Sequence, residues 1–142
     1  SSTQRLAGYE QALKDAGIAH DPALVGYVEA FRRRDGAAAM DDLLSGGGQP
    51  DAIFCFSDPL ALGAMRILHK RGIRMPEDIA VVGFEDGHFS TPSLSSVSPD
   101  KRFIAAKALD LLRARLDGAN LPPASYLAPY TLIERESSLH LS

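Results

Sequence analysis

The apolar residues of this chain change their spacing from one segment to the next, and these changes predict its helices and strands. The first helix is marked by apolar residues at steps of three and four: Leu6, Tyr9, Leu13 and Ala16. Such a stripe predicts an amphipathic helix over 3–17, with Thr3 as its N-cap and Gly17 as its stop.

Later helices are predicted over 35–44, 58–71 and 100–117, each followed by a glycine, and the last two carry an apolar stripe. Asp35 caps the first of these, and Ser57 or Asp58 begins the second, with Pro59 in its first turn. Short runs rich in β-branched and aromatic residues predict strands: over 24–31, 52–56, 79–84 and 130–134, and a short edge strand at 95–98.

The order of these elements predicts the fold class. Strands and helices alternate, which is typical of βαβ units in an α/β domain with a mostly parallel, doubly wound sheet. The run 79–84 is apolar without alternation, as expected for a strand that is covered on both faces. Because the chain opens on a helix, we expect a further strand ahead of it.

Composition and charge narrow the functional classes. A chain of 142 residues suggests one domain, and its net charge of -3 argues against a surface that grips duplex DNA. The single cysteine, Cys55, lies in an apolar run, so we expect a buried, inert thiol and no disulfide within the chain. No apolar stretch approaches the ~20 residues that span a membrane, and the first residues do not form a signal peptide, so we expect a cytoplasmic location.

Ligands of open parallel sheets bind beyond the carboxyl ends of the strands. At that edge the predicted elements place one arginine, one aromatic ring and several acceptors: Arg5, Phe31, Ser57, Asp58 and Glu85. A ring can cover the C–H face of a sugar, carboxylates accept from hydroxyls, and a guanidinium donates to oxygens. The sequence therefore predicts a site for a polyhydroxylated ligand, with further candidate contacts from neighbouring residues: Arg33, Arg34, Asp86 and His88.

Each candidate also has a structural explanation. The alternatives are a helix cap for Ser57 and Asp58, a core position for Phe31, a turn for Glu85 and Asp86, and a solvated surface for Arg5 and residues 32–34. The hypothesis of a site depends on the convergence of these residues on one edge.

The sequence contains no motif for catalysis or for binding a metal or a nucleotide. The four histidines are dispersed, and the patterns GxGxxG, GxSxG and HExxH and the phosphate-binding loop are absent. We therefore expect neither an enzyme nor a cofactor.

The helix predicted over 58–71 is apolar on two sides. One stripe contains Leu60, Ala64, Ile67 and Leu68, whereas Leu62 and Met65 lie elsewhere on the helix. One side can cover the sheet, and the other needs a second partner. We favour a dimer contact over burial within the chain.

Four blocks of this sequence resemble motifs of the LacI/GalR transcription regulators, and together they extend over about residues 3–138. Residues 5–9 match R-x-x-G-aromatic, and residues 132–137 match L-[VI]-x-R-x-S. Between them, residues 51–64 resemble the D-A-[IL]-x-x-x-N-D-x-x-A-x-G block, and residues 72–86 resemble G-x-x-[VI]-P-x-D-[VI]-x-[VI]-x-G-[FY]-D.

The resemblance implies the effector-binding domain of such a regulator, with the periplasmic-binding-protein-like type I fold. Residues 1–99 and 124–142 would form mainly the C-terminal lobe, and residues 100–123 a helix and crossover of the N-terminal lobe. Effector would bind between the lobes, and lobe closure would control operator DNA, which is bound through a helix-turn-helix absent from this chain.

The resemblance also implies roles for individual residues. It assigns polar effector contacts to Arg5, Asp58 and Glu85 and the aromatic platform to Phe31. It assigns the interface of a homodimer to one helix: Leu62, Met65 and Arg66.

Two departures from the family pattern bear on the effector. Ser57 replaces the usual asparagine and lacks its amide donor, and Glu85 replaces the usual aspartate and is one methylene longer. Both side chains therefore extend a different distance into the pocket. The arginines after Phe31 suggest an anionic or phosphorylated effector as a further hypothesis. The alternatives to a regulator are a solute-binding protein of a sugar transport system and, less favoured, a doubly wound enzyme.

Overall fold

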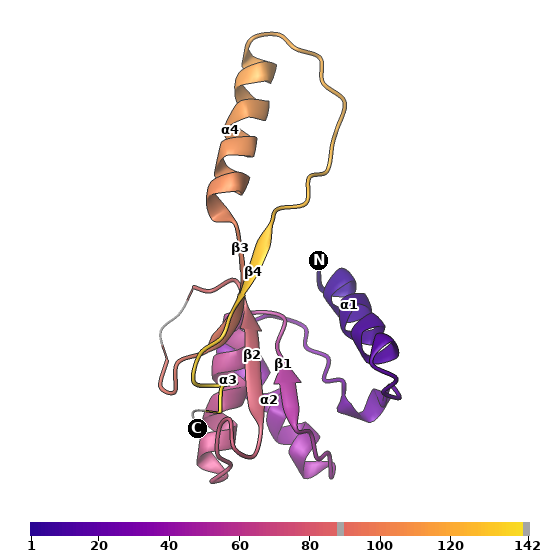
Figure 1. Ribbon diagram of the computed structural model, residues 1–142, viewed down its shortest axis with the longest axis vertical. Helices are drawn as coiled ribbons and strands as arrows, with labels where there is room; N and C mark the ends of the chain where they lie inside the picture. The colour runs from indigo at the N-terminus through magenta and orange to yellow at the C-terminus, as the bar shows by residue number, and fades with distance from the viewer. Residues whose placement is uncertain (88–89, 141–142) are drawn as a thin grey trace.

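The computed structural model describes residues 1–87 and 90–140 (Figure 1). The described elements follow one another along the chain as α1 (Ser2–Asp15), a 3₁₀ turn η1 (Pro22–Leu24), α2 (Arg33–Ser45), β1 (Ala52–Phe54), α3 (Asp58–Lys70), β2 (Ala80–Phe84), β3 (Ser95–Pro99), α4 (Lys101–Leu116) and β4 (Tyr130–Ile133).

The strands form one sheet in the order β1-β2-β3-β4. β1, β2 and β3 are parallel, and β4 runs antiparallel to β3. The prediction of a mostly parallel α/β sheet is therefore confirmed. The prediction that 95–98 is an edge strand is wrong, because β3 pairs with β2 on one side and β4 on the other.

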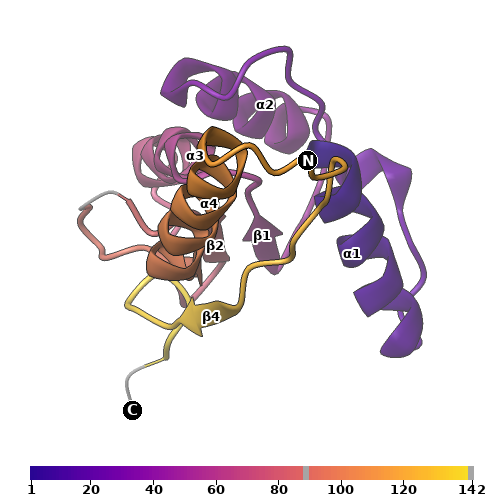
Figure 2. The same ribbon diagram turned by 90° about the horizontal axis from the view of Figure 1, so that it is seen from above.

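Helices α2 and α3 pack against each other on one side of the sheet (Figure 2). They can approach closely because glycine stands at their crossing. A Cβ at Gly36 would collide with the backbone of Leu60, and a Cβ at Gly63 would collide with the carbonyl oxygen of Arg33. The core beneath them contains Ala61, Leu68 and Val81, each fully buried.

Helices α1 and α2 begin slightly earlier than the sequence predicts. Ser1, rather than Thr3, caps α1, because its hydroxyl accepts from the backbone N–H of Gln4 and the Gln4 side chain accepts in return. Asp35 lies in the first turn of α2 and accepts from the backbone N–H of Arg32, so it is not the N-cap.

The predicted strand over 24–31 is wrong. Val25 has extended backbone angles (φ −105°, ψ 113°), yet within the described residues no strand pairs with this segment. A strand needs a hydrogen-bonded neighbour, and in the described residues the edge strand β1 pairs with β2 and not with this segment. The side-chain pattern therefore favours an extended backbone here, but not a strand.

Helix α4 projects from the sheet like an arm, between β3 and the return through β4 (Figure 1). Asp100 caps it by accepting from the backbone N–H of Phe103. No residue of α4, all of which is described, is buried. None of the helices in the described residues combines the length and the apolar character needed to cross a membrane.

Candidate functional site

The carboxyl ends of β1 and β2 lie side by side because the two strands are parallel. The chain leaves β1 through Cys55, whose N–H donates to the carbonyl oxygen of Val82, and then reaches Phe56. β2 ends at Phe84 and is followed by Glu85. This edge is where the candidate residues of the two strands meet.

Arg5 reaches this edge from α1. Its guanidinium donates to the carbonyl oxygen of Phe56 and lies 3.8 Å from the centre of the Phe84 ring. A guanidinium over an aromatic face is attracted by the ring electrons. Arg5 therefore joins α1 to the ends of two neighbouring strands, and it is half-buried there.

Ser57 and Asp58 are buried, with exposed fractions of 4% and 1%. The Ser57 hydroxyl accepts from the backbone N–H of Leu60, so it caps α3. One carboxylate oxygen of Asp58 accepts from the Ser96 hydroxyl at 2.7 Å, and the other accepts from the backbone N–H of Gly87 at 2.8 Å. Asp58 thus connects α3 to β3 and to the turn after β2.

That turn is conformationally unusual. Glu85 and Asp86 have φ values of +103° and +52°, which non-glycine residues seldom adopt. The N–H of Glu85 donates to the carbonyl oxygen of Val97, and the N–H of Asp86 donates to the Ser96 hydroxyl. Such strain persists where the surrounding contacts enforce it, and it is concentrated at functional sites.

Arg135 holds the turn from the far end of the chain. Its guanidinium bonds to the Asp86 carboxylate at 2.6 Å and to the carbonyl oxygen of Leu94 at 2.7 Å. The Glu85 side chain stays exposed on this fixed backbone. The result is a carboxylate that is free to accept hydrogen bonds and is held next to the strand end that Arg5 covers.

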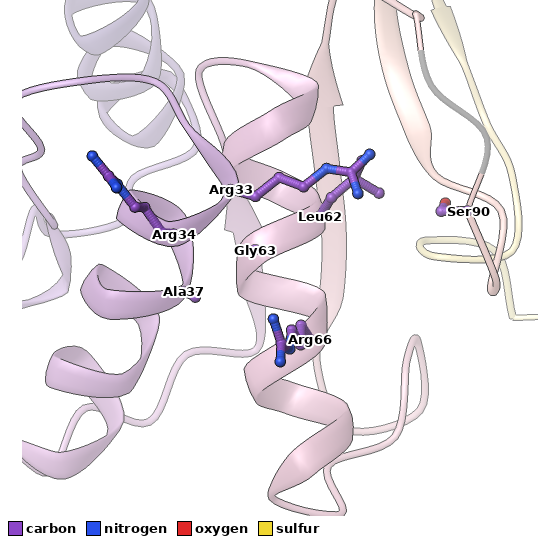
Figure 3. A pocket seen from close by; sticks show the side chains of 7 residues that line it. All are labelled: Arg33, Arg34, Ala37, Leu62, Gly63, Arg66 and Ser90. Atoms are coloured by element: carbon purple, nitrogen blue, oxygen red, sulfur yellow. The ribbon is translucent and has the colours of Figure 1, made fainter.

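Among the described residues, the other predicted contacts make no hydrogen bond or ion pair with this network, and one of them cannot be placed. Phe31 is 43% exposed just before α2. His88 lies outside the described residues. Arg33 and Arg34 line a pocket of about 470 Å³ between α2 and α3, together with Leu62 and Arg66 (Figure 3).

Two of the residues with predicted roles are packed inside the chain. Met65 belongs to the buried core, so it faces neighbours within the chain. Cys55 is buried as well, and burial raises the pKa of its thiol to about 12 from an ordinary value near 9. The thiol is therefore protonated at neutral pH, in agreement with the prediction of an inert cysteine.

Comparison with known proteins identifies the family. The model of the periplasmic binding protein-like domain matches residues 1–138. The chain belongs to this family, and the relatives that it resembles are transcription regulators, among them solved structures of the LacI type.

Individual relatives agree with that assignment. The HTH-type transcriptional regulator CelR of Thermobifida fusca is 36% identical over 140 residues, which cover 96% of this chain and 41% of CelR. A solved LacI-family regulator from Sanguibacter keddieii is 41% identical, with a TM-score of 0.88 over 94% of this chain and 51% of its own. A solved CelR–cellobiose complex is 36% identical, with a TM-score of 0.88 over 96% of this chain and 42% of its own.

The chain thus spans about two-fifths of the length of CelR. Within the described residues, no group of three or more histidine, cysteine or acidic side chains could hold a metal ion. The groups described at the strand ends are hydrogen-bonding side chains and aromatic rings.

Sequence reasoning misses two of the residues that build the site. It places Ser96 only in a strand, and Arg135 only in a family motif. Neither lies near its partner in sequence, since Arg135 is separated from Asp86 by 49 positions and Ser96 from Asp58 by 38. The L-[VI]-x-R-x-S motif is the one available signal for Arg135.

Proposed function

We propose that this chain is the effector-sensing part of a LacI-type transcription regulator and that its effector is a sugar-like molecule. The contacts would come from Arg5, Phe31, Ser57, Asp58 and Glu85. The relatives support this proposal, because those compared are named as transcription regulators and one is solved with cellobiose. It is a binding function, without a chemical step.

One observation carries the proposal. Arg5 covers the ends of two parallel strands, directly beside a strained turn that holds the exposed carboxylate of Glu85. A guanidinium donates and a carboxylate accepts, so the pair complements the hydroxyls of a sugar, which do both. The edge is also where ligands of open parallel sheets bind.

The five residues would contribute unequally. Arg5, Phe31 and Glu85 are accessible, so they are the groups we expect to touch the effector. Ser57 and Asp58 are buried, and their oxygens already accept hydrogen bonds from the chain. Their part would be to fix α3 and the Glu85 turn, unless the effector replaces those internal partners.

The remaining parts of the proposal concern the protein that carries this chain. Residues 1–99 and 124–142 would form mainly the C-terminal lobe, and residues 100–123, with α4, would pack in a second lobe. Effector would close the lobes and shift the equilibrium between two arrangements of a homodimer. A separate domain would bind operator DNA in the cytoplasm, and the name of CelR as an HTH-type regulator supports this.

A thermal-shift experiment on the protein that carries this chain tests the proposal. We would use cellobiose, glucose and gluconate as probes, with Arg5→Ala and Glu85→Gln as variants and Glu77→Gln as the control at an exposed position. At about 100 times its dissociation constant, a bound sugar should add about 2.7 kcal/mol of stability. We expect a shift in the wild type and in Glu77→Gln, and its loss in the other two.

Two results would count against the proposal. One is a sugar-induced shift that survives both Arg5→Ala and Glu85→Gln, which would place the sugar elsewhere. The other is the absence of a shift with every probe. The acidic probe addresses the charge of the effector, because an anionic effector predicts that gluconate outperforms glucose.

A further inference from the structure

Arg135 is fixed by hydrogen bonds at both its side chain and its backbone. Its guanidinium donates to the Asp86 carboxylate at 2.6 Å and to the carbonyl oxygen of Leu94 at 2.7 Å. Its backbone N–H donates to the Ser95 hydroxyl at 2.7 Å, and that hydroxyl lies 3.1 Å from the carbonyl oxygen of Arg135. The side chain is 32% exposed. Because a guanidinium is planar and its donors are rigid, one held in this way fixes the place of the carboxylate that it binds.

The turn after β2 gathers negative charge. Asp58, Glu85 and Asp86 bring three carboxylates to it, since Asp58 accepts from the backbone N–H of Gly87. Within the described residues, the pair between Asp86 and Arg135 is the one ion pair that these carboxylates form. Like charges at close range repel one another, and the repulsion is stronger where water is partly excluded. Arg135 therefore neutralises one of three charges that would otherwise drive the turn apart.

The conformation of this turn needs such support. Glu85 and Asp86 both have positive φ values, which are costly for residues with a side chain. Their backbone N–H groups bond to β3, at the carbonyl oxygen of Val97 and the hydroxyl of Ser96. The Asp86 carboxylate is held separately, by Arg135. Because Glu85 directly precedes Asp86, a change in the backbone of Asp86 would redirect the exposed Glu85 carboxylate.

Arg135 also joins this turn to the strands that carry α4. It lies just after β4, the strand that returns from α4 and pairs with β3 (Figure 1). On the outgoing side, Ser96 of β3 accepts from the turn, and Lys101, the first residue of α4, donates to the carbonyl oxygen of Asp86 at 3.4 Å. The position of Glu85 therefore depends on both strands, and Arg135 is the contact that carries the dependence on the return through β4.

We propose that Arg135 is a positioning residue of the effector site: by binding Asp86 it holds the strained turn in the conformation from which Glu85 binds the effector. This proposal rests on the proposed sugar-binding function and adds to it a residue that does not touch the sugar. Part of the affinity for the effector is then set by the ion pair between Arg135 and Asp86.

Calorimetric titration of the protein that carries this chain tests the proposal, with cellobiose, glucose and gluconate as probes. Arg135→Gln should weaken the binding of a sugar about tenfold, because the Asp86 carboxylate loses its partner. Arg135→Lys keeps the charge without the planar fork, so the loss should be only about threefold. Adding Asp86→Asn to Arg135→Gln should recover part of the affinity, because the unpaired carboxylate is removed. A merely structural role of Arg135 does not predict this recovery.

Arg71→Gln is the matched control. Arg71 is 35% exposed and bonds to Asp41 at 2.7 Å, so it resembles Arg135 in burial and in its ion pair, but it joins the end of α3 to α2. Its substitution should change the sugar affinity less than about twofold. Hydrogen exchange followed by mass spectrometry reports on the turn itself. Residues 84–87 should exchange at least about tenfold faster in Arg135→Gln than in the wild type or in Arg71→Gln.

Three results would overturn the proposal. The first is an Arg135→Gln variant that binds the sugar as tightly as the wild type does, which would leave the proposed sugar function standing. The second is an equal loss of affinity in Arg71→Gln. The third is unchanged exchange of residues 84–87 in Arg135→Gln, which is measured without any sugar. If the wild type binds none of the probes, the sugar function fails, and the exchange measurement alone decides whether Arg135 positions the turn.

Discussion

At the scale of single residues, one buried carboxylate organises the edge of the sheet. Burying a charge is costly unless hydrogen bonds compensate it. Both oxygens of Asp58 accept from the chain, one from Ser96 and one from Gly87. Gly83 leaves room for this arrangement, because a Cβ there would collide with the Asp58 carboxylate. The position of the Glu85 turn therefore depends on Asp58.

Substituting Asp58→Asn should destabilise the fold. An amide offers one acceptor where the chain presents two donors, so one buried group loses its partner. We expect a loss of about 1.5–3 kcal/mol in the free energy of unfolding, measured by urea denaturation. The exposed Asp110→Asn on α4 is the control and should stay within about 0.5 kcal/mol of the wild type. Equal stability of the two variants would refute this role for Asp58.

The residues that lie near a site can be predicted from sequence more readily than the distant residues to which they are hydrogen-bonded. The helix cap of Ser57 is local, because it joins residues three positions apart, and the sequence indicates it. The bonds from Ser96 to Asp58 and from Arg135 to Asp86 depend on the register of β3 between β2 and β4. The hydrophobic pattern along the chain leaves that register open.

At the scale of elements, the crossing of α2 and α3 is a close contact between two helix backbones. Glycines remove the side chains that would keep the two backbones apart. A Cβ at Gly63 would collide with the carbonyl oxygen of Arg33, and it would lie 2.7 Å from the backbone nitrogen of Ala37. Backbone atoms within a helix cannot move aside at small cost, so the crossing depends on glycine at this position.

Gly63→Ala should therefore destabilise the chain by about 1–3 kcal/mol, as overpacking of a core does. Gly8→Ala provides a matched control, since Gly8 lies inside α1 and a Cβ added there would meet no atom within 4 Å. That substitution should be stabilising by about 0.5–1 kcal/mol, because alanine favours the helix. Thermal denaturation of both variants checks the opposite signs, and a neutral Gly63→Ala would contradict the steric argument.

Elements with strong local signals can be predicted well, whereas those that depend on neighbours cannot. Helix α3 follows from Ser57, Pro59 and an apolar stripe, and the prediction places its ends to within one residue. The segment 24–31 is extended at Val25 but lacks a partner, and β3 is an interior strand because β4 returns beside it. Pairing depends on distant segments, which residue types alone do not specify.

At the scale of the whole molecule, α4 is an arm whose apolar side is uncovered. Leu109, Leu112 and Leu116 are 55%, 54% and 77% exposed, and they follow one another at steps of three and four. Such a stripe normally faces a core. We therefore place α4 in the proposed second lobe, where its leucines would be buried.

The 142-residue chain by itself should associate through this stripe at high concentration, because uncovered apolar surface drives association. Replacing Leu109, Leu112 and Leu116 with glutamine should lower the association measured by sedimentation velocity at least about tenfold, since each buried leucine contributes about 1.5–3 kcal/mol. The control replaces three polar residues of the same helix with glutamine: Arg102, Asp110 and Arg113. Unchanged association of the leucine variant would contradict this prediction. Two copies of the chain would then meet through Leu62 and Arg66 on α3, the proposed dimer face.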